Sequence, residues 1–277
     1  MTVPLQPNLH PVALVGAGPG DPELLTIRAR QMLDAADVVV HDRLVSKEIL
    51  SSIRPTVHLI DVGKARDAVR ATQPEIHRLL IELAYTGARV VRLKGGDPYV
   101  FGRGSEEADA LGAAGLRVVV VPGLSSALTA PLSAGIPVTE RGVARSFAVL
   151  TVETRSGADF ETLRRLAGAE TLVLLMGAKR LPEICRELMR LGRPADLPAA
   201  AIERATQPQE RVLRSTLGEL AEDVKKHGLR PPMTTVIGEV ARARESLGAR
   251  APASARAHQP LHLLRDTSAT HWLQGQP

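Results

Sequence analysis

The chain has very few aromatic residues: one tryptophan, two tyrosines and three phenylalanines among 277 residues. Its core must therefore be aliphatic, and the aromatic platforms on which single-stranded nucleic acids stack are scarce. A single cysteine, Cys185, excludes an internal disulfide and a cysteine-rich zinc site. The histidines show no metal-ligand spacing, so we expect no metal.

Long apolar runs are also missing, since none reaches the roughly 18–20 residues that a membrane-spanning helix needs. The first ten residues have neither the basic start nor the apolar core of a secretory signal, so we expect a cytoplasmic protein. The net charge of +5 and the pI of about 9.8 suit an anionic partner. The basic residues are scattered, which favours a small anionic ligand over nucleic acid or a membrane surface. A nucleic-acid-binding module stays the alternative from a different class.

Short apolar runs alternate with helical patterns in the first half of the chain. The runs that read as buried strands lie at 12–15, 38–40, 57–60, 90–93 and 118–121. This alternation predicts right-handed crossovers and an α/β domain with a parallel sheet, which we place at residues 11–143. Each strand ends in a polar or glycine-rich turn, and open α/β sheets bind ligands at that edge.

The second half mixes parallel and antiparallel signals. Strands are expected at 147–151, 172–176, 199–203, 211–215 and 234–237, with helices at 160–166, 179–191 and 217–226. We therefore expect a second α/β domain with a mixed sheet at residues 144–243. The segment 244–277 is rich in Ala, Arg, Ser, His and Pro, which predicts a partly ordered tail.

The stretch RVVRLKGGDPYVFGRGSEE at 89–107 joins a buried strand to a helix through two glycine-rich loops. Gly95 and Gly96 permit backbone conformations that other residues avoid, and Pro98 disfavours helix at Asp97. Ser105 is expected to cap the helix that follows. This loop lies where such sheets bind ligands. The alternative is a strand-to-helix connection without a function.

The first loop nearly matches the dinucleotide-binding fingerprint, because Gly16 and Gly18 follow a strand and Asp42 ends the next one. Asp21, however, stands at the third glycine position. It is expected to cap a helix over 22–36, where its carboxylate would repel a pyrophosphate at the helix N-terminus. The loop therefore favours a ligand without phosphate over NAD.

Several segments resemble, in the same order, those of the tetrapyrrole methyltransferases. They are GAGPGDPELLT at 16–26, HDRLVS at 41–46, GK at 63–64, KGGDPYVFGRGSEE at 94–107, VPGLSSALTAPLSAGIPVTERG at 121–142, LVLLMG at 172–177, IERAT at 202–206 and IGEV at 237–240. The resemblance covers residues 11–241. The DRLVS and FGRG segments narrow it to the members that methylate uroporphyrinogen III.

The resemblance implies a fold and a reaction. It implies two α/β domains with the methyl donor, S-adenosyl-L-methionine, in a cleft between them, and a homodimer. Methyl groups go to two pyrrole carbons of uroporphyrinogen III, giving precorrin-2 by way of precorrin-1 and leaving S-adenosyl-L-homocysteine. The product feeds cobalamin or sirohaem biosynthesis. Members that act on a later corrin intermediate, a diphthine precursor or ribosomal RNA are the runner-up.

The resemblance also assigns site residues by position. The donor site includes Pro19, Gly95, Gly96, Asp97, Val100, Ser125, Ser126, Met176 and Ala205. Asp42 matches a proton acceptor, Lys64 a proton donor and Arg103 a catalytic arginine that faces the substrate. Arg43, Arg103, Glu106 and Arg141 fall at substrate positions, which suits arginine because its guanidinium binds carboxylates through two parallel hydrogen bonds. Which group acts as the base stays open.

Overall fold

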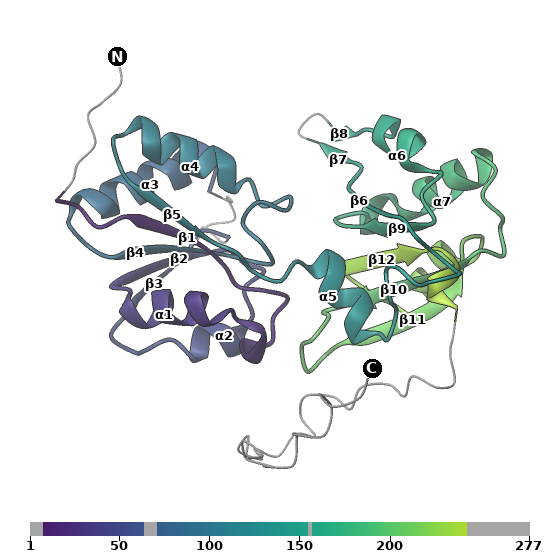
Figure 1. Cartoon of the computed structure of the whole chain (residues 1–277), viewed down its shortest axis with the longest axis horizontal. Coiled ribbons are helices and arrows are strands. Elements are labelled where there is room, and N and C mark those ends of the chain that lie inside the picture. Colours follow the sequence, from purple (N-terminus) through teal and green to yellow (C-terminus); the bar gives the residue numbers. More distant parts are fainter. Residues whose placement is uncertain (1–7, 64–70, 155–156, 243–277) are drawn as a thin grey trace, which may run out of the picture.

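In the computed structural model, which describes residues 8–63, 71–154 and 157–242, the chain forms two sheets in separate lobes (Figure 1). The first sheet has the strand order β3-β2-β4-β1-β5, and all its neighbours are parallel. Its strands are β1 (Val12–Gly16), β2 (Val38–His41), β3 (His58–Asp61), β4 (Val90–Lys94) and β5 (Val118–Val121). The parallel sheet predicted from the alternating pattern is confirmed.

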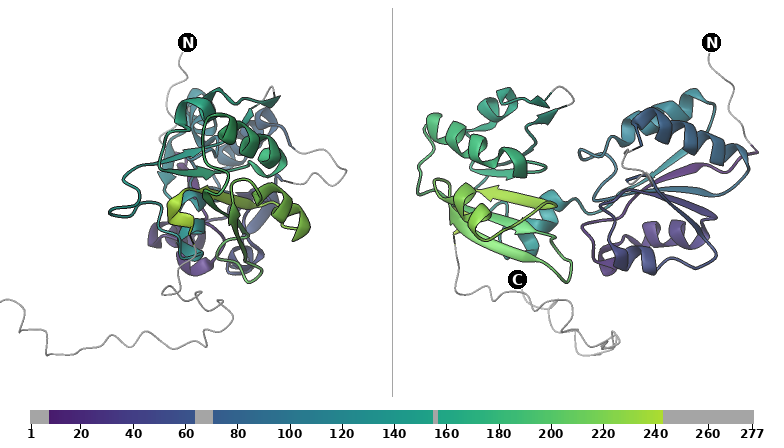
Figure 2. Two further views of the ribbon diagram at one scale, coloured as in Figure 1. Left: turned by 90° about the vertical axis from the view of Figure 1, so that its right-hand side faces the viewer. Right: turned by 180° about the vertical axis from the view of Figure 1, so that it is seen from behind.

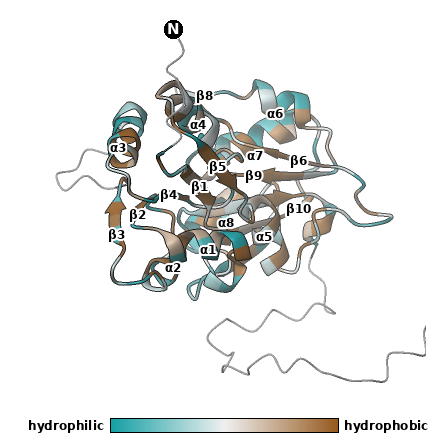
Figure 3. Ribbon diagram, turned by 60° about the vertical axis from the view of Figure 1, so that its left-hand side comes forward, coloured by the Kyte–Doolittle hydropathy of each residue, from teal (hydrophilic) through white to brown (hydrophobic). Residues whose placement is uncertain are grey.

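Both faces of this sheet are covered by helices, which explains why its central strands β1, β2 and β4 are buried along their whole length. The helices are α1 (Ile27–Ala35), α2 (Lys47–Ser51), α3 (Gln73–Tyr85) and α4 (Gly104–Ala113). Ala13 and Val15 of β1 pack in the cluster with α1 and α2, whereas Val12 and Leu14 pack in the cluster with α3 and α4. Figure 3 shows the resulting hydrophobic strands between more polar helices.

The second sheet has the order β11-β10-β12-β9-β6, with β6 parallel to β9 and the other neighbours antiparallel. Its strands are β6 (Phe147–Leu150), β9 (Thr171–Leu174), β10 (Pro198–Glu203), β11 (Arg211–Thr216) and β12 (Met233–Ile237). Helices α6 (Glu161–Leu166), α7 (Leu181–Arg190) and α8 (Leu220–Lys226) share one core cluster on this sheet. The mixed sheet is therefore confirmed as well.

Helix α5 (Ser126–Ser133) covers the other face of the second sheet. Its Ala130 packs with Ala200 of β10 and Val236 of β12, and Figures 1 and 2 show the helix beside that sheet. The helix lies before the expected domain boundary at 143–144, yet it packs with the second lobe. The chain thus passes from one lobe to the other directly after β5.

Some local expectations differ from the structure. The expected helix over 22–36 is a 3₁₀ turn, η1 (Pro22–Leu24), followed by α1, because the Thr26 side chain accepts a hydrogen bond from Ala29 N and starts a new helix. Helix α4 is preceded by Arg103 rather than capped by Ser105.

The smaller elements complete the fold. The short strands β7 (Glu153–Thr154) and β8 (Gly157–Ala158) pair with each other, and the second lobe also carries the 3₁₀ turns η2 (Ala178–Arg180) and η3 (Glu239–Ala241). The expected tail at 244–277 lies outside the described residues. In the described part of the chain, no helix is long and apolar enough to cross a membrane.

Candidate active site

Glycines join the loops that leave β1, β4 and β5. Gly18 N donates to Gly96 O at 3.1 Å, and Gly96 N donates back to Gly18 O at 2.8 Å. A Cβ added to Gly123 would lie 2.2 Å from Gly96 O, and one added to Gly16 would lie 2.4 Å from Gly123 N. Only glycine permits such close backbone contacts. The three loops are therefore fixed against one another at the carboxyl edge of the sheet.

Asp97 strengthens this contact through both of its carboxylate oxygens. Its Oδ1 accepts a hydrogen bond from Tyr99 N at 2.8 Å, and its Oδ2 accepts one from Gly123 N at 3.1 Å. A Cβ on Gly96 would come no closer than 4.0 Å to Ser126 N, which places these two residues side by side without crowding. The structure thus brings Gly96, Asp97 and Ser126 together, and their role in binding the donor stays a prediction.

The loop after β1 also touches the loop after β10, so that the two lobes meet there. Gln207 Nε2 donates to Pro19 O at 3.4 Å, and Asp21 N donates to Thr206 Oγ1 at 3.3 Å. Ala205 is buried directly before Thr206. Pro19 and Ala205, which come from different lobes, are therefore held on neighbouring loops.

Ser125 directly precedes α5, and Met176 follows Leu175, which packs against the first turn of that helix. Ser125 precedes the helix and accepts a hydrogen bond from Ala127 N at 3.2 Å, while Leu175 packs against Ala127. Met176 has a left-handed backbone (φ 57°), and its side chain is about half exposed rather than packed in the core. Val100 is exposed as well. Both apolar side chains are accessible to a ligand.

The loop after β2 lies between the loops after β3 and β4. A Cβ on Gly95 would lie 3.0 Å from Leu44 Cβ, and one on Gly63 would lie 2.5 Å from Arg43 Cβ. Arg43 is exposed next to these contacts. The predicted proton donor, Lys64, follows Gly63 directly but falls outside the described residues.

Arg103 forms a two-pronged ion pair with Glu106. Its Nε lies 2.8 Å from Oε1 and its Nη2 lies 2.6 Å from Oε2, and both side chains are nearly half exposed. Hydrogen bonding to Glu106 raises the pKa of the Arg103 guanidinium above its usual value. Arg141 is exposed in the segment after α5. Among the described residues, no hydrogen bond joins it to the pair of Arg103 and Glu106. The structure thus pairs two of the four predicted substrate residues.

Asp42 belongs to a charged cluster under the edge of the sheet. Its Oδ1 accepts a short hydrogen bond from Nη2 of Arg92, whose Nε lies 3.2 Å from Glu107 Oε1. Lys94 Nζ and Gln73 Nε2 each lie 3.0 Å from the same Glu107 oxygen. Arg92, Lys94 and Glu107 are almost completely buried. Burial, reinforced by the positive charge of Arg92, lowers the pKa of Lys94.

Sequence reasoning missed Arg92, Lys94 and Glu107 as members of the site. A signal was present, because two charged residues two apart in a strand buried on both faces require a buried partner on one face. The identity of that partner, on the helix after the loop, could not be deduced from the strand alone.

The sequence of the two lobes matches a known protein family. The model of the "Tetrapyrrole (Corrin/Porphyrin) Methylases" matches residues 11–221. The chain belongs to this family.

Several members of the family are similar over nearly all of the two lobes. An S-adenosyl-L-methionine-dependent uroporphyrinogen III methyltransferase of Methanosarcina barkeri is 44% identical over 246 residues, which is 87% of this chain and 96% of that protein. A uroporphyrin-III C-methyltransferase of Thermus thermophilus, solved with S-adenosyl homocysteine, is 45% identical with a TM-score of 0.74 and covers 84% of this chain and 99% of its own.

Longer relatives also match. A siroheme synthase of Methylobacillus flagellatus is 44% identical over 87% of this chain, but over only 52% of its own length. The chain therefore spans about half of that protein and nearly all of the Methanosarcina methyltransferase. The match to half of a larger protein says nothing about the activity of the other half.

The residues that the family places around the donor fit a small cationic ligand. They are small or apolar residues and one aspartate, Asp97, which already accepts two amide hydrogen bonds. A carboxylate near a sulfonium is favourable, whereas it would repel a phosphate. In the described ranges, no group of three His, Cys, Asp or Glu side chains is placed to hold a metal ion.

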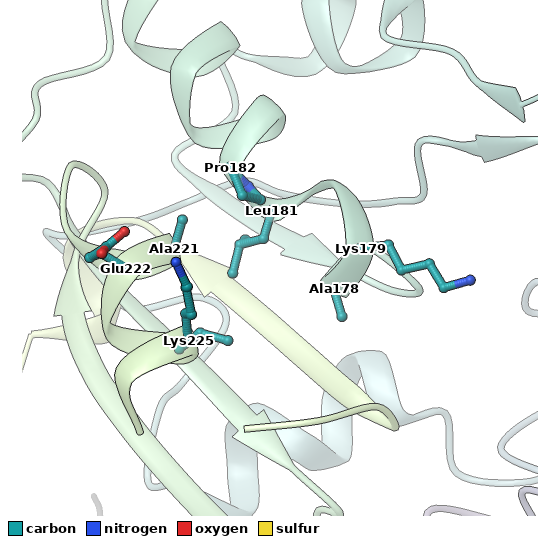
Figure 4. A pocket seen from close by; sticks show the side chains of 8 residues that line it. Ala178, Lys179, Leu181, Pro182, Ala221, Glu222 and Lys225 are labelled. Atoms are coloured by element: carbon teal, nitrogen blue, oxygen red, sulfur yellow. The ribbon is translucent and has the colours of Figure 1, made fainter. Parts of the chain in front are cut away.

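Hollows of the surface also occur away from these residues. One of about 310 Å³ lies in the second lobe between the start of α7 and α8 (Figure 4). A second is lined by α6 and α7. Neither is lined by a residue of the predicted site. The expected donor cleft between the lobes stays a prediction.

Proposed function

We propose that this chain transfers methyl groups from S-adenosyl-L-methionine to uroporphyrinogen III. The observation that carries the proposal is the match to the Methanosarcina methyltransferase at 44% identity over 96% of that protein. The joined loops after β1, β4 and β5 support it, because they lie at the sheet edge where α/β proteins bind ligands. The donor, when bound, supplies an electrophilic methyl group.

The donor site is formed by residues of both lobes. Pro19, Gly95, Gly96, Asp97 and Val100 come from the first lobe. In the second lobe, Ser125 and Ser126 stand at the start of α5, and Met176 and Ala205 lie in the loops after β9 and β10. The small residues let backbone groups approach the ligand, and the half-exposed Met176 covers it. Holding the methyl group in line with the attacking carbon is mainly a matter of positioning.

The substrate site is proposed to be the arginines beside that edge. The substrate carries eight carboxylates, and Arg103 is already oriented to bind a carboxylate, since Glu106 occupies its fork. A substrate carboxylate either replaces Glu106 at the Arg103 guanidinium or binds the guanidinium together with it. Arg43 and Arg141 contact further carboxylates. No Ser or Cys nucleophile is needed because a pyrrole carbon attacks the methyl group.

Proton transfer completes each methylation. When the carbon–methyl bond forms and the carbon–sulfur bond breaks, the substrate ring must lose a proton. Asp42 accepts this proton through its partly exposed carboxylate and passes it to solvent before the next round, while the donor's sulfur leaves as the neutral thioether. The role of Lys64 as a proton donor stays a prediction. Two rounds give precorrin-2 by way of precorrin-1.

The test is incubation of the purified chain with isotope-labelled donor and enzymatically made uroporphyrinogen III, followed by mass spectrometry of the tetrapyrrole. The expected product carries two labelled methyl groups. No label on uroporphyrinogen III, together with label on a later corrin intermediate, would support the runner-up. Affinity for RNA that falls steeply with salt, without methylation, would support the nucleic-acid alternative.

We further propose that the chain acts as a homodimer. One face of α5 is buried on the second sheet, while Leu124, Leu128 and Leu132, spaced four residues apart, are exposed. A second copy would remove these leucines from water. Light scattering is expected to give twice the mass of the chain, and Leu128→Glu with Leu132→Glu is expected to give a monomer. A monomeric unmodified chain would contradict the proposal.

The cytoplasmic location stays a prediction.

A further inference from the structure

The cluster beneath Asp42 does more than neutralise buried charge. Arg92 touches three elements at once: Nε contacts Glu107 on α4, Nη2 contacts Asp42 after β2, and Nη1 lies 3.3 Å from both Val40 O and Leu93 O. Every nitrogen of the guanidinium is therefore engaged, and the plane of the group is fixed. An isolated ion pair between mobile side chains would have no such constraint.

The geometry of Asp42 shows what this constraint achieves. Arg92 binds Oδ1 from below the edge of the sheet, and the side chain is about one third exposed. No donor in the described part of the chain contacts Oδ2. One carboxylate oxygen is thus held by the protein, and the other is left for a proton from outside.

Glu107 in turn holds Arg92. Its Oε1 accepts hydrogen bonds from Arg92, Lys94 and Gln73, while its buried Oε2 has no partner among the described residues. An acceptor shared by three donors at the centre of a buried cluster restricts the movement of each of them. Glu107 therefore holds Arg92 in place, and Arg92 in turn holds Asp42.

We propose that Arg92 is a positioning residue, which fixes the Asp42 carboxylate so that Oδ2 faces the proton released by the methylated ring. This inference rests on the proposed function and on the role of Asp42 within it. Lysine cannot replace Arg92 fully, because one ammonium group cannot reach Asp42, Glu107 and two carbonyls in one plane.

The test compares turnover, KM and donor affinity in the full chain and its variants. Arg92→Met is expected to lower kcat about 100-fold, the effect of a displaced catalytic group. KM and the affinity for S-adenosyl homocysteine are expected to change less than about threefold. Arg92→Lys is expected to recover part of the loss. Glu107 keeps Lys94 and Gln73 as partners in these variants, so both variants are expected to fold.

The chain provides a matched control in Arg89 and Asp37. This pair joins the same two strands, β4 and β2, at the opposite edge of the sheet, with Arg89 Nη2 2.6 Å from Asp37 Oδ1. Arg89→Met removes an ion pair between the same two strands away from the site, although this pair is exposed whereas Arg92 is buried. It is expected to leave kcat within about twofold of the unmodified chain.

A double variant separates positioning from a general loss of structure. If Arg92 acts through Asp42, Arg92→Met adds little to the loss caused by Asp42→Asn. Losses that multiply, or an equal loss in Arg89→Met, would overturn the inference. If Arg92→Met does not fold, Arg92→Lys takes its place, and its loss of turnover is compared alone and in combination with Asp42→Asn. An unmodified chain that methylates nothing would instead contradict the proposed function itself.

Discussion

Replacing Gly123 with alanine tests whether the joined loops form the donor site. The added Cβ would lie 2.2 Å from Gly96 O and 2.7 Å from Gly16 Cα, where ordinary contact begins near 3.4 Å. Both neighbours are backbone atoms, so no side chain can rotate away. One of the loops after β1, β4 or β5 must therefore move by about 1 Å.

The size of the effect follows from that displacement. Forcing an extra carbon into a packed contact costs about 1–3 kcal/mol, which lowers the melting temperature by about 2–4 °C per kcal/mol in a chain of this size. A shift of about 1 Å in groups that position a substrate costs about 100-fold in turnover. Turnover is therefore expected to fall much more than stability.

The assays are a melting curve, calorimetric titration with S-adenosyl homocysteine, and turnover with labelled donor. Gly112→Ala is the matched control, because Gly112 lies in α4 and a Cβ there would meet nothing within 4 Å. That variant is expected to gain about 0.5–1 kcal/mol of stability from the reduced freedom of the unfolded chain. Unchanged donor affinity and turnover in Gly123→Ala would refute the placement of the site.

Three further predictions follow from single side chains. Arg103→Ala is expected to retain affinity for S-adenosyl homocysteine by calorimetry but to lose most turnover, and full turnover would remove Arg103 from the mechanism. Glu107→Ala leaves Lys94 buried without its carboxylate and Arg92 with Asp42 alone, which costs about 3–5 kcal/mol and is measured as a lower urea midpoint; an unchanged midpoint would contradict this, and Glu107→Gln is expected to lose less. Burial raises the pKa of the Cys185 thiol from 9.0 to about 11. The unfolded chain therefore releases the thiol proton at a lower pH than the folded chain does. The contribution of this thiol to the free energy of unfolding is lost as the pH rises from about 9 to about 11. Cys185→Ala is expected to remove that part of the pH dependence, and the intact thiol is expected to react with a disulfide reagent at pH 8 only after unfolding.

The sheets could be predicted because their strands are local signals. Each apolar run is bounded by glycine, proline or polar residues, and the observed strands differ from the expected ranges by one or two residues at their ends. The turn at 22–25 could not be predicted in the same way. Asp21 and Thr26 are both good caps, and the sequence does not show that Leu25 leaves the helical conformation between them.

The position of α5 depends on tertiary packing that no local pattern contains. Its small residues suit close packing against either sheet. The segment between β5 and α5 is also too short to be recognised as a linker between domains. The place of the helix is decided by contacts between residues far apart in the sequence, such as Ala130 with Val236, which are more than one hundred residues apart. Domain boundaries drawn from linker composition fail where a helix crosses between lobes.

The candidate site shows the same division between local and distant information. Loop residues such as Gly96 and Asp97 follow from turn chemistry and from family motifs. Arg92 could not be assigned in this way, because it lies inside an apolar strand and its acceptors come from β2 and α4. Charged side chains in a strand buried on both faces cost free energy unless they are paired. Arg92 lies two residues before the end of β4, next to the proposed donor site, and this position supports the inference that the Asp42 carboxylate is held in a fixed orientation.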